Sequence, residues 1–219
     1  MRRMADSRDP QQPVEAARYA LLRRLAYAMR HHMVVHLQPI AMIMEVMERR
    51  LGLPAPNLAQ IHDAMGKVHQ HSRAAVQSSL DVVSWLAPED GQLVALDAGV
   101  QECFDLLRSH LNFRGFALRN EVSALPQLVS RSAVRHVLPA VLLVMTDHGT
   151  APADVVLRAR EAARAVEVTV ALQPGQGSPG FSGAPHYRLL EWRDVEALAA
   201  AEGVMLARDA QATTLSISA

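Results

Sequence analysis

The feature that most constrains the fold is a run of apolar and small residues at alternating steps of three and four in the segment 58–86. A period of 3.5 residues is typical of a helix that packs in a coiled coil or a four-helix bundle. The pattern predicts one helix along the whole segment, with this stripe as its packing face. The stripe consists of Leu58, Ile61, Met65, Val68, Ser72, Ala75, Ser79, Val82 and Leu86.

A second apolar stripe precedes it, and its members are Leu22, Leu25, Met29, Met33, Ile40, Ile43, Met47 and Leu51. Between the stripes lies the segment LGLPAPN, residues 51–57, whose Gly and Pro residues indicate a turn. We therefore predict an antiparallel helical hairpin over residues 14–88. Because a single hairpin leaves part of its stripe uncovered, we expect two copies to form a four-helix bundle across a two-fold axis.

Shorter segments of strand and helix type alternate after residue 88. Their order departs from strict strand–helix repetition, which predicts an α/β sandwich with a mixed, largely antiparallel sheet over residues 89–219. Residues 1–13 are expected to be a disordered tail. The predicted strands are 93–97, 116–122, 154–161, 165–172, 204–209 and 213–218, and the predicted helices are 98–112, 130–148 and 189–202.

The composition argues against several classes of function. Lys and Arg together number 22, as do Asp and Glu, so no overall positive charge favours nucleic-acid binding. A single cysteine, Cys103, excludes an internal disulfide and a CxxC metal site. No apolar run approaches the ~18 residues that span a bilayer. The N-terminal segment also lacks the apolar core of a secretory signal. We expect a cytoplasmic protein with neither nucleic acid nor membrane as a partner.

Three of the ten histidines, His31, His32 and His36, fall within six residues of the first predicted helix. At about 100° per residue, His36 lies on the apolar stripe, His32 at its flank and His31 nearly opposite. An exposed neutral imidazole is a nucleophile, although a surface histidine without any function is the simpler alternative. His32 and His36 have the spacing of two metal ligands, but no third ligand is evident, and we predict no metal site.

A histidine-bearing helix, a short turn, a heptad helix and an α/β sandwich follow one another in this chain. This order resembles the catalytic core of bacterial two-component sensor histidine kinases, in which a dimerisation and phosphoacceptor hairpin precedes an ATP-binding domain. One branch of that family carries His–acid–apolar–Asn–Asn–Leu–Leu–x–x–Ile on its first helix. The segment HHMVVHLQPI, residues 31–40, aligns with it without a gap, with Met33, Leu37 and Ile40 in the apolar places. The resemblance implies that His31 is the phosphoacceptor.

The same resemblance implies a docking site for a partner around His31. The residues expected there are Arg24, Tyr27, Arg30, His32, Val35 and Gln38. Two of them depart from the family pattern. His32 replaces the acid that follows the phosphoacceptor, and Val35 stands where many members carry Asn or Thr to orient a water molecule.

The α/β segment departs from the family at its nucleotide ligands. In RHVLPAVLLVMTDHG, residues 135–149, Ala140 and Val144 stand where the family has the asparagines that bind Mg²⁺–ATP, and only Asp147 matches an acidic position. LQPGQGSPG, from Leu172 onward, lacks the aspartate of the adenine-binding Asp-x-Gly-x-Gly loop. The resemblance therefore implies a degenerate, ATPase-like domain that binds no cofactor.

Three functions remain open. The first is a histidine phosphotransferase of a phosphorelay, which accepts a phosphoryl group on His31 from one receiver domain and passes it to another without ATP. The receiver would supply the Mg²⁺. The second is a non-catalytic dimeric pseudokinase adaptor that binds a receiver domain or a kinase. The third is an active kinase with a divergent site, against which the missing ligands argue. The expected partners are a second copy and response-regulator receiver domains.

Overall fold

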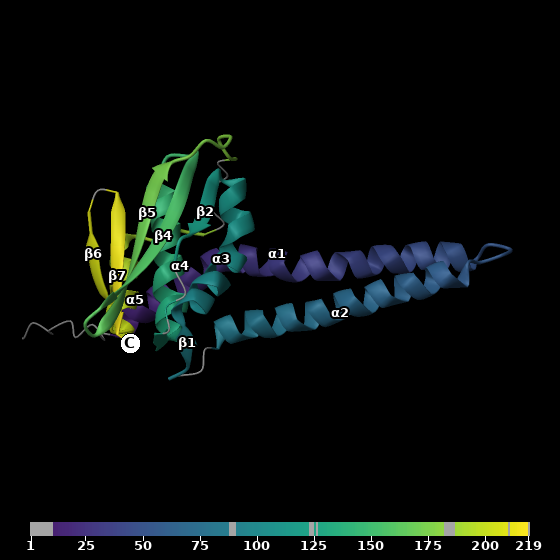
Figure 1. The fold of residues 1–219 in the computed structure, drawn as a ribbon, viewed down its shortest axis with the longest axis horizontal. Helices are drawn as coiled ribbons and strands as arrows, with labels where there is room; N and C mark the ends of the chain where they lie inside the picture. The colour runs from purple at the N-terminus through teal and green to yellow at the C-terminus, as the bar shows by residue number, and fades with distance from the viewer. Residues whose placement is uncertain are drawn as a thin grey trace, which may run out of the picture. The chain divides into compact units, whose positions relative to one another are not determined.

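The computed structural model describes residues 11–87, 91–122, 125, 127–181, 187–209 and 211–218. The chain forms two compact units. The hairpin unit is Ala26–Pro88, and the α/β unit combines Met1–Leu25 with Glu89–Ala219. Helix α1 (Gln11–Leu51) contributes its first part to the α/β unit and the rest to the hairpin unit (Figure 1). None of the described helices is long and apolar enough to cross a membrane.

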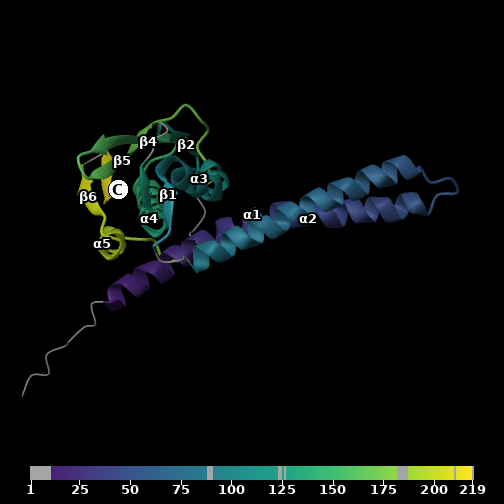
Figure 2. The same ribbon diagram turned by 60° about the horizontal axis from the view of Figure 1, so that its bottom comes forward.

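The hairpin unit consists of α1 from Ala26 onward and α2 (Leu58–Leu86), which lie side by side and run in opposite directions (Figures 1 and 2). The side chain of Asn57 caps α2 by accepting a hydrogen bond from the backbone N–H of Gln60 at 3.2 Å. The buried cluster near the turn consists of Met47, Ile61 and Ala64, with Ile43 and Val68 packed against it.

The seam between the two helices is rotated relative to the stripe predicted for α2. Its buried residues are Ile61, Ala64, Ala75, Ser78 and Trp85. Leu58, Met65 and Leu86 were predicted in the same stripe, yet they are 71%, 57% and 54% exposed. The prediction of one stripe is therefore wrong in part. Helix α2 has two adjacent apolar faces, and only one of them packs against α1.

The α/β unit is built on a five-stranded mixed sheet with the order β2-β4-β5-β7-β6. Strands β2 and β4 pair in parallel, and the other neighbours are antiparallel. Two short strands, β1 (Leu93–Ala95) and β3 (Leu128–Ser130), form a separate antiparallel pair. The strands of the main sheet are β2 (Phe116–Asn120), β4 (Ala153–Ala162), β5 (Ala165–Pro174), β6 (Met205–Arg208) and β7 (Ala212–Ser218).

Three helices cover one face of this sheet: α3 (Leu96–Phe113), α4 (Arg131–His148) and α5 (Trp192–Ala201) (Figure 2). The centre of the core is α4, in which every residue from Ala133 to Thr146 is buried. A near-continuous apolar sequence explains why α4 occupies this central place. On β5 and β7, buried residues alternate with less buried ones, as expected for a sheet with one covered face.

The predicted fold class, a helical hairpin followed by an α/β sandwich, is confirmed. The predicted helices and strands lie close to the observed ones, but β3 was missed because three residues are too few to show an alternating pattern. Residues 1–10 of the predicted tail lie outside the described residues. The segment Gln11–Pro13 was also assigned to the tail, but it forms the start of α1. The dimeric bundle stays a prediction.

Candidate functional site

His31 lies on the part of α1 that belongs to the hairpin unit, and its side chain is exposed. Met29 and Met47 are buried and lie on the opposite side of the helix, about 160° away around its axis. No hydrogen bond or ion pair connects the imidazole with another residue of the described chain. A rigid helix therefore presents His31 to any partner that approaches from solvent.

The side chains around His31 are mostly exposed as well. Tyr27 and Val35 lie one helical turn before and after it, and both are exposed. The guanidinium of Arg30 lies 5.3 Å from the centre of the Tyr27 ring, and Gln38 is exposed. His31 thus sits in a strip that offers apolar, aromatic and cationic groups together. Val35 brings no group that could hold a water molecule near the imidazole.

His32 and His36 differ from His31 in being half-buried. Their rings meet edge to face, with centroids 6.0 Å apart. Among the described residues, no group of three or more His, Cys, Asp or Glu side chains is arranged to hold a metal ion. Of the three histidines, His31 is therefore the most exposed.

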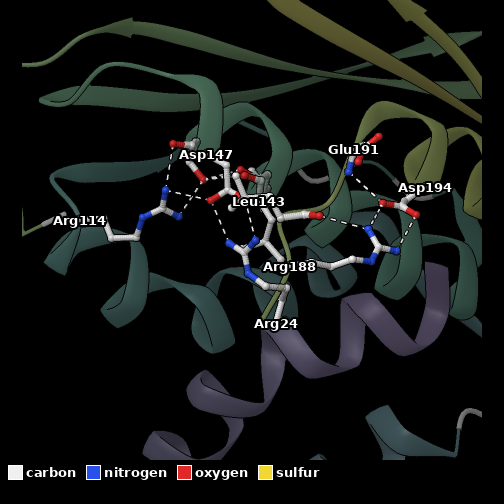
Figure 3. Close-up of polar contacts among 10 residues, drawn as sticks. Arg24, Arg114, Leu143, Asp147, Arg188, Glu191 and Asp194 are labelled. Carbon is white, nitrogen blue, oxygen red and sulfur yellow. Dashed lines mark hydrogen bonds and ion pairs between the residues drawn. The ribbon is translucent and has the colours of Figure 1, made fainter. Parts of the chain in front are cut away.

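Arg24 does not belong to the exposed strip. It lies in the α/β unit, is only 7% exposed, and donates through Nη1 and Nη2 to the two carboxylate oxygens of Asp147 at 2.8 and 2.9 Å (Figure 3). Arg114 approaches the same carboxylate from α3's end, with Nη2 3.0 Å from Oδ1. The prediction that Arg24 flanks the docking site is therefore wrong, because its guanidinium is buried and already paired.

The sequence does contain a signal for the burial of Arg24. A stripe of buried residues runs along the first part of α1 at alternating steps of three and one, and Arg24 falls within it. Its other members are Ala17, Ala20, Leu21, Leu25 and Ala28. An arginine inside an apolar stripe indicates a buried carboxylate partner. Local pattern could not identify that partner as Asp147, which is 123 positions away in the chain.

The two positions that the family resemblance links to Mg²⁺–ATP, and the acidic position after them, lie on α4. Ala140 and Val144 are completely buried on α4 and have no oxygen atom in their side chains. The carboxylate of Asp147 is only 2% exposed and lies between two guanidinium groups. In this structure, these positions contribute to the core and to a buried ion pair.

A second buried charged cluster joins α1, α4 and α5. The Oε1 atom of Glu202 lies 2.7 Å from Nδ1 of His136 and 3.3 Å from the guanidinium of Arg18. The hydroxyl of Ser132 donates to Oε2 at 2.6 Å. Burial raises the pKa of Glu202, but the hydrogen bonds from His136 and Ser132 outweigh it and hold the pKa at about 2. The cluster is structural, since its carboxylate is fully engaged.

The glycine-rich segment after β5 packs closely against the turn between α3 and β2. The backbone N–H of Phe181 donates to the carbonyl of Phe113 at 3.0 Å, and the two rings stack with centroids 5.2 Å apart. A Cβ atom on Gly180 would lie 2.0 Å from the carbonyl carbon of Arg114. Gly180 is therefore needed for backbone contact within the unit, which accounts for a glycine here without any phosphate cradle.

No protein-family model matches the sequence, and no curated protein matches it. Several solved structures do match this chain. The Acinetobacter baumannii histidine kinase AdeS is 12% identical over 80% of this chain and 94% of that chain, with a TM-score of 0.45. A bacterial phosphotransferase is 14% identical over 90% and 95%, with a TM-score of 0.42. A histidine kinase from Burkholderia phymatum is 16% identical over 90% and 97%, with a TM-score of 0.43.

These proteins are histidine kinases and a phosphotransferase, which is the resemblance that the sequence predicts. At such identities and TM-scores, the likeness is limited to the path of the backbone. The functional argument therefore rests on this protein's own residues.

Proposed function

We propose that this protein is a histidine phosphotransfer protein that accepts a phosphoryl group on His31 from one receiver domain and passes it to another. The observation that carries the proposal is the exposed imidazole of His31, on the side of a long helix that faces away from the hairpin seam. A partner that brings its own acidic site and Mg²⁺ needs only such a nucleophile and a surface on which to dock.

The chemistry is one in-line displacement in each direction. A ring nitrogen of neutral His31 attacks the phosphorus atom of an aspartyl phosphate on the receiver. The N–P bond forms, the bond from phosphorus to the aspartate oxygen breaks, and the aspartate leaves as a carboxylate. The imidazole proton is released to solvent. Transfer to the second receiver reverses these steps, with the carboxylate of that receiver as the nucleophile.

The α/β unit supports a function without ATP. A nucleoside triphosphate needs Mg²⁺ held by oxygen ligands, together with donors for its phosphate oxygens. Ala140 and Val144 offer neither, and Asp147 is committed to Arg24 and Arg114. We therefore assign this unit a structural role in phosphotransfer rather than that of a phosphoryl donor.

A second apolar face on the hairpin unit supports the proposed homodimer. Several exposed apolar residues directly follow a buried or half-buried residue of their helix. They include Leu37 and Met44 on α1, and Met65, Val76 and Val83 on α2. In an antiparallel pair, residues displaced in the same rotational sense from the seam emerge on the same face of the hairpin. We call these five residues the outer apolar face.

The opposite flank of α2 differs from the outer apolar face. On this flank of α2, several residues that directly precede a buried or half-buried residue are polar. They include Asp63, Lys67, Gln77 and Asp81. One flank of α2 is thus apolar and the other is polar. His31 lies outside the outer apolar face, so dimerisation through that face leaves the imidazole accessible.

One observation favours a second function, that of a non-catalytic dimeric adaptor. His32 stands where the family has an acid, and Val35 stands where many members orient a water molecule. An adaptor would use the same exposed strip to bind a receiver domain or a kinase, without forming phosphohistidine. The two functions share the docking surface and the dimer, and they differ in whether His31 becomes phosphorylated.

The test is phosphotransfer from phosphorylated receiver domains of the source organism to the full-length protein. The proposal predicts rapid, acid-labile labelling of the wild type by at least one receiver. His31→Gln should abolish this labelling. His69→Gln removes an exposed histidine of α2 and should leave it unchanged. Receiver binding without labelling would establish the adaptor instead, and labelling that survives His31→Gln would refute the role of His31.

A further inference from the structure

The α/β unit contains a cavity that the proposed phosphotransfer does not use. Its volume is about 400 Å³, within the range of small-molecule sites. It opens between the C-terminal half of α4, the end of β5, the first residue of α5 and the turn from β6 to β7. It adjoins Val144, one of the positions at which the family's metal ligands are lost, so its occupant must be recognised by other groups.

One wall of the cavity carries a cation with no acidic partner. The guanidinium of Arg208 lies 4.5 Å from the centre of the Trp192 ring, and no ion pair joins it to another described residue. Its neighbour Asp209 already accepts the backbone N–H groups of Gln211 and Ala212, each at 2.8 Å. A guanidinium stacked on an aromatic face keeps its N–H edge available for an anion.

A hydroxyl-bearing residue lies beside this cation. Thr213 lines the cavity and is only 1% exposed. Thr213 is the direct cross-strand partner of Arg208 in the pairing of β6 with β7. Such partners project from the same face of a sheet at close distance. One carboxylate group could therefore accept from both side chains.

The rest of the lining is mainly apolar. Val144, Met145 and Leu172 contribute aliphatic or thioether groups, and Trp192 contributes an indole ring. His148 also lines the cavity and is exposed, and Asp209 adds one negative charge. The guanidinium of Arg208 can pair with one negative charge, whereas the carboxylate of Asp209 disfavours the several charges of a nucleotide.

From these groups, we infer that the cavity is a binding site for a small aromatic monocarboxylate. The carboxylate accepts hydrogen bonds from Arg208 and Thr213, while the flat apolar body lies against Val144, Met145 and Leu172. Binding pairs the carboxylate with two donors and covers apolar surface at the same time. This inference is independent of phosphotransfer, because none of these residues belongs to the hairpin unit.

The test is calorimetric titration of the full-length protein with 2-naphthoate and with its uncharged counterpart, 2-naphthamide. The wild type should bind the carboxylate at least tenfold more tightly than the amide. Arg208→Gln should weaken carboxylate binding at least tenfold, and Thr213→Val should weaken it severalfold. Arg164→Gln removes an exposed arginine outside the cavity and should change nothing.

Thermal unfolding of each variant checks that it is folded, and His31→Gln should bind the probe like the wild type. Failure of phosphotransfer and failure of this site are therefore distinguishable. The inference is overturned if 2-naphthoate does not bind, if the amide binds equally well, or if folded Arg208→Gln binds the carboxylate as tightly as the wild type.

Discussion

The hairpin unit and the α/β unit bury their side chains in different ways. In α4 of the α/β unit, every residue from Ala133 to Thr146 is buried. In α2 of the hairpin unit, the buried residues include the small side chains Ala64, Ala75 and Ser78, while several larger apolar residues are exposed. The α/β core is complete within one chain. The hairpin leaves an apolar face that a second molecule can cover.

The two units also differ in where they keep their charges. The α/β unit buries Asp147 with Arg24, and Glu202 with His136. In the hairpin unit, the described acidic and basic side chains are exposed or half-buried. Buried charges of this kind hold a scaffold together, whereas an exposed histidine on a rigid helix is open to reaction. The proposed phosphoacceptor thus lies on the hairpin unit, and the buried ion pairs lie in the α/β unit.

The largest effect on the free energy of unfolding is expected from Asp147→Ala in the α/β unit. The substitution leaves the buried guanidinium of Arg24 without its partner and should lower the free energy of unfolding by about 3–5 kcal/mol. Arg24→Met should cost less, because Asp147 keeps Arg114. Asp105→Ala breaks an exposed pair with Arg108 and should cost less than about 1 kcal/mol. Urea unfolding followed by tryptophan fluorescence measures all three. Equal costs for Asp147→Ala and Asp105→Ala would contradict a structural role for the buried pair.

Acid should weaken the α/β unit through Glu202. Because the pKa of Glu202 is lowered from 4.5 to about 2, its ionised form stabilises the fold above pH 4.5, and this contribution is lost as the pH falls toward 2. The loss amounts to at most about 3 kcal/mol. Glu202→Gln should flatten the pH dependence of urea unfolding in this window, whereas Glu196→Gln, an exposed change on α5, should not. If the free energy of unfolding of Glu202→Gln depends on pH as steeply as that of the wild type, groups other than Glu202 dominate the pH dependence.

Aspartate substitutions should separate the two apolar faces of α2. Met65→Asp charges the outer apolar face and should dissociate the dimer while the hairpin stays folded, at a cost of about 1.5–3 kcal/mol per protomer. Ile61→Asp charges the buried seam and should unfold the hairpin itself. Gln70→Asp lies away from both faces and serves as the control. Sedimentation equilibrium reports the mass, and circular dichroism reports the helix content. A wild-type mass of 23.9 kDa in dilute solution would refute the dimer.

The smallest effect is expected from Mg²⁺–ATP. Since Ala140 and Val144 supply no oxygen ligand, millimolar Mg²⁺–ATP should leave the thermal midpoint of the α/β unit unchanged within error. Calorimetry checks the same point directly. A micromolar dissociation constant would restore the kinase interpretation and would require ligands other than the positions discussed here.

Sequence patterns were sufficient for the order of the helices and of every strand except the short β3, because both long helices and the alternating strands carry strong periodicity. They were insufficient to predict that Met65 is exposed. A helix with two adjacent apolar faces shows one broad stripe, and only packing decides which edge of the stripe forms the seam. They also failed for Arg24, whose burial depends on Asp147, a partner far away in the sequence. The exposure of His31 follows from helical geometry alone. The cavity at Arg208 and Thr213 depends on strand pairing that no local pattern reveals.

The central claim, that His31 is the phosphoacceptor, is tested most directly by locating the phosphoryl group after transfer from a cognate receiver. Electron-transfer fragmentation of the labelled protein at neutral pH distinguishes His31 from its neighbours His32 and His36. The account predicts phosphate on His31, because it is the exposed member of the three and faces away from the seam. Phosphate on His32 or His36, or receiver binding that leaves all three histidines unmodified, would contradict it.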